Sequence, residues 1–306
     1  MIQIGIAVGK QEGMYDLANM PRQVAGEIMA TIDAIDRVLP GVRQVLEASE
    51  LKIIYDPDNR HGIFDEGEDD DCQGYYLWHI HTMYLGDTGI SHSIAHEIAH
   101  VLDTLAGPTS AEVEEWLAGG PLDSMCTYSV RWFFPSTGRF DFYVADLPKD
   151  DLQRRFQEEF DPTNFVRWLV ARAILEATLA REDKSIYTGV LLNQILRGSI
   201  YVFSQSRFIV ERVAHLFEAW VYVWQVDHKE PSRGVYPPSA DVYSGGIYWG
   251  DSWIREKNGA IRRMFQEMLE VIGVSDNGQP SQHLVAKMQD RAVYLKTKQA
   301  RTLLAR

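Results

Sequence analysis

The hydrophobic pattern of the first part of the chain alternates between short apolar runs and a longer amphipathic stretch. "IQIGIAV" (2–8) and "LKIIYDP" (51–57) are short and rich in isoleucine, which favours buried strands. Between them, "PRQVAGEIMATIDAIDRVL" (21–39) places apolar residues at helical spacing after a proline that suits a first turn. "YYLWHIHTMYL" (75–85) is aromatic and β-prone. We therefore expect strand, helix, strand and strand in that order.

A helix rich in histidine is predicted next. The turn "GDTG" precedes it, and Thr88 or Ser91 could act as the N-cap through its hydroxyl. The helix should end near Ala106, because Gly107 and Pro108 stop it.

From about Lys149 the pattern is mainly helical. Helical spacing recurs in four windows, 150–160, 163–183, 207–226 and 254–273, and a loop rich in tyrosine, proline and glycine (231–250) separates the last two. "SDNGQPS" (275–281) has the composition of a linker. We expect one α+β domain over 1–273, with a small mixed β-sheet and the histidine helix in 1–148 and a mainly helical portion in 149–273. Residues 274–306 would form the linker and a basic C-terminal helix.

Composition narrows the classes of function. The 306 residues are 45% hydrophobic and 24% charged, with a net charge of -13, which argues against nucleic acid as the main partner. Two cysteines, Cys72 and Cys126, suggest a reducing compartment. There is no secretory leader and no apolar run long enough to span a membrane, so a cytoplasmic location is expected.

Two charged segments depart from the average. The acidic run 65–71 lacks the spacing of an EF-hand, so we interpret it as a solvated loop. The tail 282–306 carries six Lys/Arg and one acid, Asp290. It is expected to be an exposed helix, and the alternative is that it docks on an acidic partner.

The candidate chemistry lies in "HSIAHEIAHVLD" (92–103). His96 and His100 are four residues apart, so a helix projects both imidazoles from one face toward a single ion. Glu97 stands at the edge of that face, where it can move protons to and from a zinc-activated water. This is the H-E-x-x-H arrangement of zinc peptidases. His92 is interpreted as a capping or supporting residue, and Asp103 as a residue that orients a ligand imidazole or merely ends the helix.

The third metal ligand must come from elsewhere in the chain. The metzincin extension fails, because Asp103 and Ala106 occupy its glycine and ligand positions. The alternative is an acid on the later helix "FIVERVAHLFEAWVYV", where Glu211, His215 and Glu218 fall near one side. Burying such groups is costly unless they are paired or bound to metal. Glu211 is the preferred ligand, with His215 and Glu218 as alternatives.

The pair "HEIAHVLD" and "ERVAHLFEAW" resembles zincin-like metallopeptidases that use a glutamate as third ligand (the gluzincin type). It is closest to the branch common in phage and mobile-element proteins, whose second motif reads roughly E-L-F-A-R-A-F-E-A-Y. Glu211 matches the ligand glutamate of that motif, and Trp220 replaces its closing tyrosine. The other matching positions are Ala214, Phe217, Glu218 and Ala219, whereas Val213 and His215 depart from the motif.

The resemblance implies a zincin-like fold and one zinc ion. In that group an acid four residues after the ligand glutamate supports a zinc-bound histidine. Here that position is His215, so Glu218 or Asp103 could take over the supporting role.

The rest of the active site is less defined by the sequence. Candidates for the donor that stabilises the oxyanion are His228, Tyr236, Tyr243 and Tyr248. The strand 75–85 could accept a substrate peptide along its edge. His79 and His81 share one face of that predicted strand and are expected to be surface histidines, with an incidental second metal site as the alternative.

The sequence therefore predicts a zinc-dependent endopeptidase with a peptide or protein substrate. In this prediction His96, His100 and Glu211 bind the metal and Glu97 is the general acid/base. The alternatives are a zinc-binding phage structural, assembly or regulatory protein without cleavage, and an effector protease that cuts one host protein.

Overall fold

The computed structural model describes residues 2–8, 14–62, 74–78, 80–106, 109, 111, 131–134, 139–142, 207–235 and 251–304. The chain divides into two compact units. The first is discontinuous and consists of Met1–Leu105 and Val213–Arg306, and the second is Ala106–Arg212. His96, Glu97, His100, His215 and Glu218 lie in the first unit, whereas Glu211 falls in the second.

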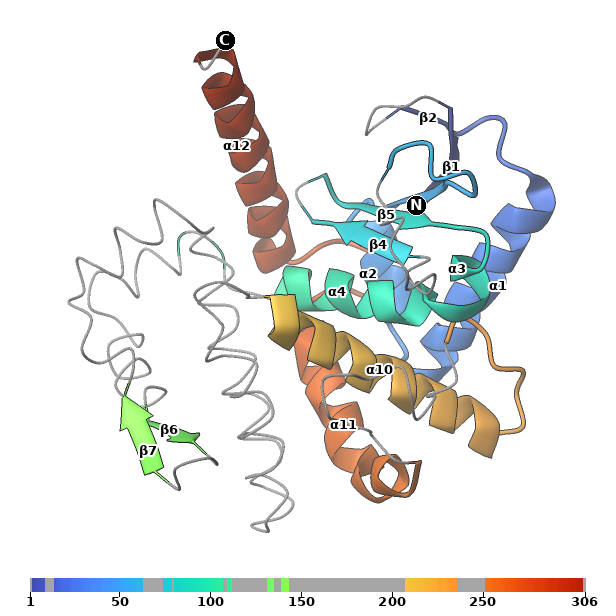
Figure 1. Ribbon diagram of the computed structural model, residues 1–306, viewed down its shortest axis with the longest axis vertical. Coiled ribbons are helices and arrows are strands. Elements are labelled where there is room, and N and C mark those ends of the chain that lie inside the picture. The colour runs from blue at the N-terminus through green and yellow to red at the C-terminus, as the bar shows by residue number, and fades with distance from the viewer. Residues whose placement is uncertain are drawn as a thin grey trace. The chain divides into compact units, whose positions relative to one another are not determined.

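A small mixed sheet forms the upper layer of the first unit (Figure 1). Its order is β2-β1-β3-β5-β4, in which β1, β3 and β5 run parallel and β2 and β4 pair antiparallel with their neighbours. The strands are β1 (Gln3–Ala7), β2 (Tyr15–Asp16), β3 (Lys52–Tyr55), β4 (Gly74–Leu77) and β5 (Thr82–Leu85). The predicted α+β class with a small mixed sheet is confirmed.

The central strands are covered on both faces. Ile53 and Ile54 are adjacent in β3, point to opposite faces, and are both fully buried. On one face, Ile54 packs with Ala7 and Tyr84 in an apolar cluster. The His61 ring lies edge-on to the Tyr84 ring of this cluster, with the two ring centroids 5.3 Å apart. The uninterrupted apolar runs seen in the sequence follow from this double burial.

Helices form the remaining layers of the first unit. Figure 1 shows α4 beneath β4 and β5, with α10 and α11 beneath α4. The helices are α1 (Arg22–Val38), α2 (Val42–Ala48), α3 (Gly89–His92), α4 (Ile94–Ala106), α10 (Arg207–Asp227), α11 (Asp251–Ile272) and α12 (Gln282–Leu304). In the second unit, β6 (Arg131–Phe134) and β7 (Arg139–Phe142) form an antiparallel pair.

The predicted single strand 75–85 is wrong, because the structure folds it into the hairpin β4–β5. The turn falls at Trp78–His81, where His81 adopts a positive φ of 51°. Its Nδ1 lies 2.7 Å from the Tyr76 hydroxyl, which stabilises the turn. This turn contains neither glycine nor proline, so its residues carry no turn signal.

His81 is therefore a core residue and not the surface histidine that was predicted. Only 2% of it is exposed. Burial, with help from the positive charges of Arg291 and Lys52, lowers the pKa of His81 to about 3. His79, its predicted partner on one strand face, lies outside the described residues.

The histidine helix is interrupted once near its start. The structure has α3 and then α4, separated at Ser93, where one helix from Thr88 or Ser91 was predicted. The Ser93 hydroxyl donates to the Gly89 carbonyl, a local bond that competes with regular helix. Thr88 precedes α3 but makes no side-chain cap. The predicted end at Ala106 is confirmed.

An aromatic core joins α10 to α11. Phe217 packs edge-on against Phe265 with centroids 4.7 Å apart, and Trp220 stacks on the same ring at 5.8 Å. The Trp220 indole also donates to Asn258 at 2.6 Å. These contacts fix the face of α10 that turns away from α11, and that face carries His215 and Glu218.

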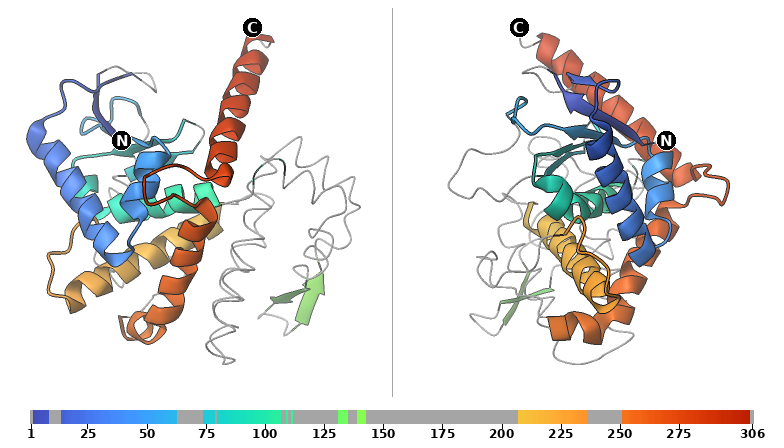
Figure 2. Two further views of the ribbon diagram at one scale, coloured as in Figure 1. Left: turned by 180° about the vertical axis from the view of Figure 1, so that it is seen from behind. Right: turned by 90° about the vertical axis from the view of Figure 1, so that its right-hand side faces the viewer.

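The basic C-terminal helix α12 is docked at its first turn. Leu284 is fully buried, and His283 Nε2 lies 3.0 Å from the Leu105 carbonyl at the end of α4. Further along, Val293 is 63% exposed, and Figure 1 and the left view of Figure 2 show the helix extending beyond the sheet. The predicted helix is confirmed, and its described side chains include both the buried Leu284 and the exposed Val293.

Several predictions fall on residues outside the described part of the chain. They are the acidic loop 65–71, both cysteines, the stop signal at Gly107–Pro108, the helices at 150–160 and 163–183, and the boundary at 148/149. Within the described residues, no helix combines the length and apolar character needed to cross a membrane.

Candidate metal centre

The centre forms where α4 passes over α10. The two helices run in opposite directions, because the start of α4 is bonded at Ala95 to Gly234, which follows the end of α10. Figure 1 shows the same arrangement. Most of α4 is buried, and its apolar residues Ile94, Ile98, Val101, Leu102 and Leu105 pack into the core. This packing leaves one face of α4 for polar groups.

The two histidines of the motif meet side by side. His96 Nε2 and His100 Nε2 are 3.1 Å apart, and their ring centroids are 4.7 Å apart. Two nitrogens bound at about 2.05 Å to a tetrahedral zinc ion would be about 3.3 Å apart. The described pair therefore has the spacing that one zinc ion requires.

Glu218 of α10 lies on the Nδ1 side of the His96 ring, whereas His100 lies on the Nε2 side. Its Oε2 is 3.4 Å from His96 Nδ1, and only 4% of the residue is exposed. A carboxylate on this side favours a proton on Nδ1 and leaves the Nε2 lone pair directed at His100. Metal-binding histidines are commonly oriented by such a carboxylate. Glu218 therefore occupies a supporting position, one of the two roles considered for it.

His215 lies next to both groups. Its ring centroid is 4.6 Å from that of His96, and its Nδ1 is 3.6 Å from Glu218 Oε2. Among the described residues, two sets of ligand atoms have all members within 4.8 Å of one another: His96, Glu97 and His100, and His96, His215 and Glu218. His96 belongs to both sets, with Nε2 facing His100 and Nδ1 facing Glu218.

Glu97 is buried against the edge strand. Only 4% of it is exposed, and a Cβ placed on Gly74 of β4 would lie 2.9 Å from Glu97 Cγ and 3.1 Å from Oε1. The lack of a side chain at Gly74 thus makes room for the carboxylate. β4 is the last strand in the order of the described sheet, so its other edge has no strand partner there.

Asp103 adds a third buried carboxylate. It is 5% exposed and stands one turn after His100 on α4. Glu97, Asp103 and Glu218 thus bury three carboxylates on the two helices that carry the histidines. Negative charge of this kind favours a bound cation, and paired imidazole nitrogens are ligands that zinc prefers, so the residues fit zinc. His92, half-buried in α3, lies on the other side of the break at Ser93.

Glu211, the predicted third ligand, lies on α10 one turn before His215. Its side chain is outside what the structure describes, so its ligand role stays a prediction. The same holds for Tyr236, Tyr243 and Tyr248 as oxyanion donors.

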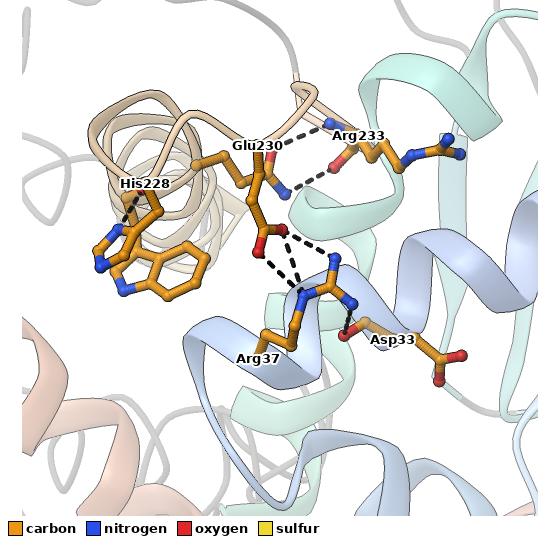
Figure 3. Close-up of polar contacts among 7 residues, drawn as sticks. Asp33, Arg37, His228, Glu230 and Arg233 are labelled. Carbon is orange, nitrogen blue, oxygen red and sulfur yellow. Dashed lines mark hydrogen bonds and ion pairs between the residues drawn. The ribbon is translucent and has the colours of Figure 1, made fainter.

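His228 lies away from the histidines. It is exposed just after α10, where its ring stacks on Trp224 with centroids 3.9 Å apart and its Nδ1 lies 2.7 Å from the Trp224 carbonyl (Figure 3). Ten residues of helix separate it from Glu218, which corresponds to about 15 Å along the axis. The described geometry does not bring His228 to the centre.

Two glycines near the centre were not recognised from the sequence. Gly74 follows the acidic run, and a glycine at the start of a strand can indicate close approach by another group. Gly234 belongs to the predicted loop 231–250, and its carbonyl accepts the Ala95 N–H one residue before His96. No protein-family model, curated protein or solved structure matches the chain.

Proposed function

We propose that the protein is a zinc-dependent metallopeptidase of zincin-like type. His96 and His100 would bind the metal through Nε2, Glu211 would be the third ligand, and Glu97 would be the general acid/base. The observation that carries the proposal is the His96–His100 pair, with nitrogens 3.1 Å apart beside a buried glutamate. A purely structural metal site has no need of an acid adjacent to its first ligand.

Each residue has a distinct part in the proposed reaction. Zinc bound at this pair would lower the pKa of water and polarise a carbonyl group. Glu97 would take a proton from that water and deliver it to the leaving nitrogen. Glu218 would hold His96 with Nε2 toward the metal. β4, the last strand of the described sheet, would align an extended peptide along its edge.

The sequence motif supports Glu211 as the third ligand. α4 and α10 run in opposite directions, and His96 lies beside His215. One turn forward on α4 leads to His100, and one turn back on α10 leads to Glu211. Among the described residues, His100 and His215 do not share a set of ligand atoms, and Glu211 is the third ligand that the sequence resemblance implies.

The ligand assignment is tested by the zinc content of purified variants. We expect Glu211→Ala to lose bound zinc, whereas Glu218→Ala should bind it more weakly by 10- to 100-fold. His215→Ala should retain it. If Glu211→Ala keeps full zinc and His215→Ala loses it, the third ligand is wrong.

The catalytic assignment needs a separate experiment. Glu97→Gln has nearly the same size and should keep zinc while cleavage of an unstructured peptide mixture disappears. Cleavage at the wild-type rate by Glu97→Gln would refute the mechanism.

A metal-binding protein without peptidase activity is the second candidate. The set His96, His215 and Glu218 favours it, because these residues offer ligand atoms without using Glu97. In that case His215→Ala, and not His100→Ala, would abolish metal binding, and wild-type protein loaded with zinc would cleave no peptide. The predicted phage setting and effector role rest on the sequence resemblance alone.

A further inference from the structure

The segment after α10, Glu230–Val235, is held against α1 and α4, and we call it the strap. Arg37 of α1 binds Glu230 through two guanidinium nitrogens, with Nε to Oε1 at 3.1 Å and Nη2 to Oε2 at 2.8 Å (Figure 3). This pairing raises the pKa of Arg37 and lowers that of Glu230. The strap is thereby anchored at its first residue.

The middle of the strap is anchored by Gln225. This residue is fully buried, and its side chain accepts from Arg233 N–H at 2.9 Å and donates to the Arg233 carbonyl at 3.2 Å. Its own carbonyl accepts the Glu230 N–H at 2.9 Å. The last turn of α10 and the strap therefore form one hydrogen-bonded unit.

The end of the strap touches the histidine helix. Gly234 has a positive φ of 69°, and its carbonyl accepts the Ala95 N–H at 2.8 Å. A Cβ at Gly234 would lie 2.2 Å from both Ile94 Cγ2 and Thr31 Cγ2. Glycine is thus required by conformation and by space. Ala95 lies in the first turn of α4, where backbone N–H groups need partners from outside the helix.

We propose that the strap is the positioning element of the histidine centre. It ties the end of α10, the helix that carries Glu218 nine residues before its last residue, to the start of α4, which carries His96. Gly234 and Arg37 would act through Ala95 by setting the separation of His96 Nδ1 from the Glu218 carboxylate. The expected effects on metal binding rest on the proposed function. The expected effect on the hydrogen bond between the strap and α4 does not.

The first test compares two arginine variants. Arg37→Met removes the anchor of the strap. Arg255→Met removes a similar pair, since Arg255 binds Asp227 at the end of α10 with Nε at 3.0 Å from both carboxylate oxygens, but it leaves the strap intact. We expect Arg37→Met to weaken zinc binding about 10-fold, as loss of outer support typically does, and Arg37→Lys to restore part of it. Arg255→Met should bind zinc as the wild type does.

A second pair uses glycines with positive φ. Gly234→Ala should change the visible absorption of cobalt-substituted protein, because cobalt bands report ligand geometry. Gly278→Ala is the matched control, since Gly278 has a φ of 77° but nothing within 4 Å of an added Cβ. If Gly234→Ala fails to fold, the cobalt-substituted Arg37→Met variant is measured in its place, and its visible absorption should change in the same way.

Amide hydrogen exchange at Ala95 provides the readout that needs no metal. We expect exchange to accelerate at least 10-fold in Arg37→Met and to stay unchanged in Arg255→Met. Unchanged exchange at Ala95 in Arg37→Met, or equal effects of both arginine variants on zinc binding, would overturn the proposal. If wild-type protein binds no zinc or cobalt, the proposed function fails, and the exchange result alone decides on the strap.

Discussion

Replacing Gly74 by alanine tests how closely the edge strand confines Glu97. The added Cβ would lie 2.7 Å from Ser93 Oγ, 2.9 Å from Glu97 Cγ and 3.1 Å from Glu97 Oε1. The Ser93 hydroxyl can rotate away, but Cγ is close to the helix backbone and cannot. Ordinary contact begins at 3.4 Å, so Glu97 has to move by about 0.5 Å.

Two effects of this shift can be estimated. Overpacking of this kind costs about 1–3 kcal/mol of stability. Misplacement of a reacting group by 1 Å costs about 100-fold in rate, so we expect a shift of half that size to lower kcat by about 10-fold. KM should change little, since the proposed role of Glu97 lies in the chemical step.

The assay measures kcat and KM on a quenched peptide, together with zinc content and denaturant unfolding. Gly26→Ala is the control, because Gly26 lies inside α1 with nothing within 4 Å of an added Cβ. That variant should gain about 1 kcal/mol of stability and keep wild-type kcat. A Gly74→Ala variant with wild-type stability and wild-type kcat would refute the close confinement of Glu97.

Three further predictions concern acidity, orientation and docking. The pKa of His81 is about 3 in the folded protein against 6.5 as the ordinary value, so the unfolded chain takes up a proton first as pH falls. Stability should fall by about 2 kcal/mol between pH 7 and pH 5, and urea unfolding of His81→Asn should lack this loss. Glu218→Gln should weaken zinc binding, measured by competition with a chelator, by about 10-fold or more while leaving the fold intact, and equal affinity would remove its supporting role. Leu284→Ala, at a fully buried position on α12, should cost about 2–5 kcal/mol by thermal unfolding, whereas Val293→Ala, at a position 63% exposed, should stay within about 0.5 kcal/mol.

The periodic segments of the fold were predictable from the sequence. β1, β3, α1, α10 and α11 lie where apolar spacing places them, because burial of one face leaves a direct trace in the sequence. The hairpin at Trp78–His81 was missed, since its turn depends on a tertiary contact between Tyr76 and His81. The turn propensities of the individual residues do not include such a contact, so they could not indicate the turn.

The same division applies to the candidate centre. His96, Glu97 and His100 could be grouped from one helix, because their spacing alone puts them near one face. The side on which Glu218 meets His96 depends on how α10 crosses α4, which the sequence of neither helix encodes. Gly74 and Gly234 act through the space they leave, so only a three-dimensional arrangement reveals them.

The discontinuity of the first unit has a consequence for synthesis on the ribosome. Residues Ala106–Arg212 separate α4 from the part of α10 that faces it. At about 5–20 residues per second, a ribosome needs roughly 5–20 s to add these approximately 100 residues. During that interval the nascent chain carries His96 and His100 without Glu218 or the strap. The centre is therefore expected to be completed late, after the sheet that supports it has already emerged.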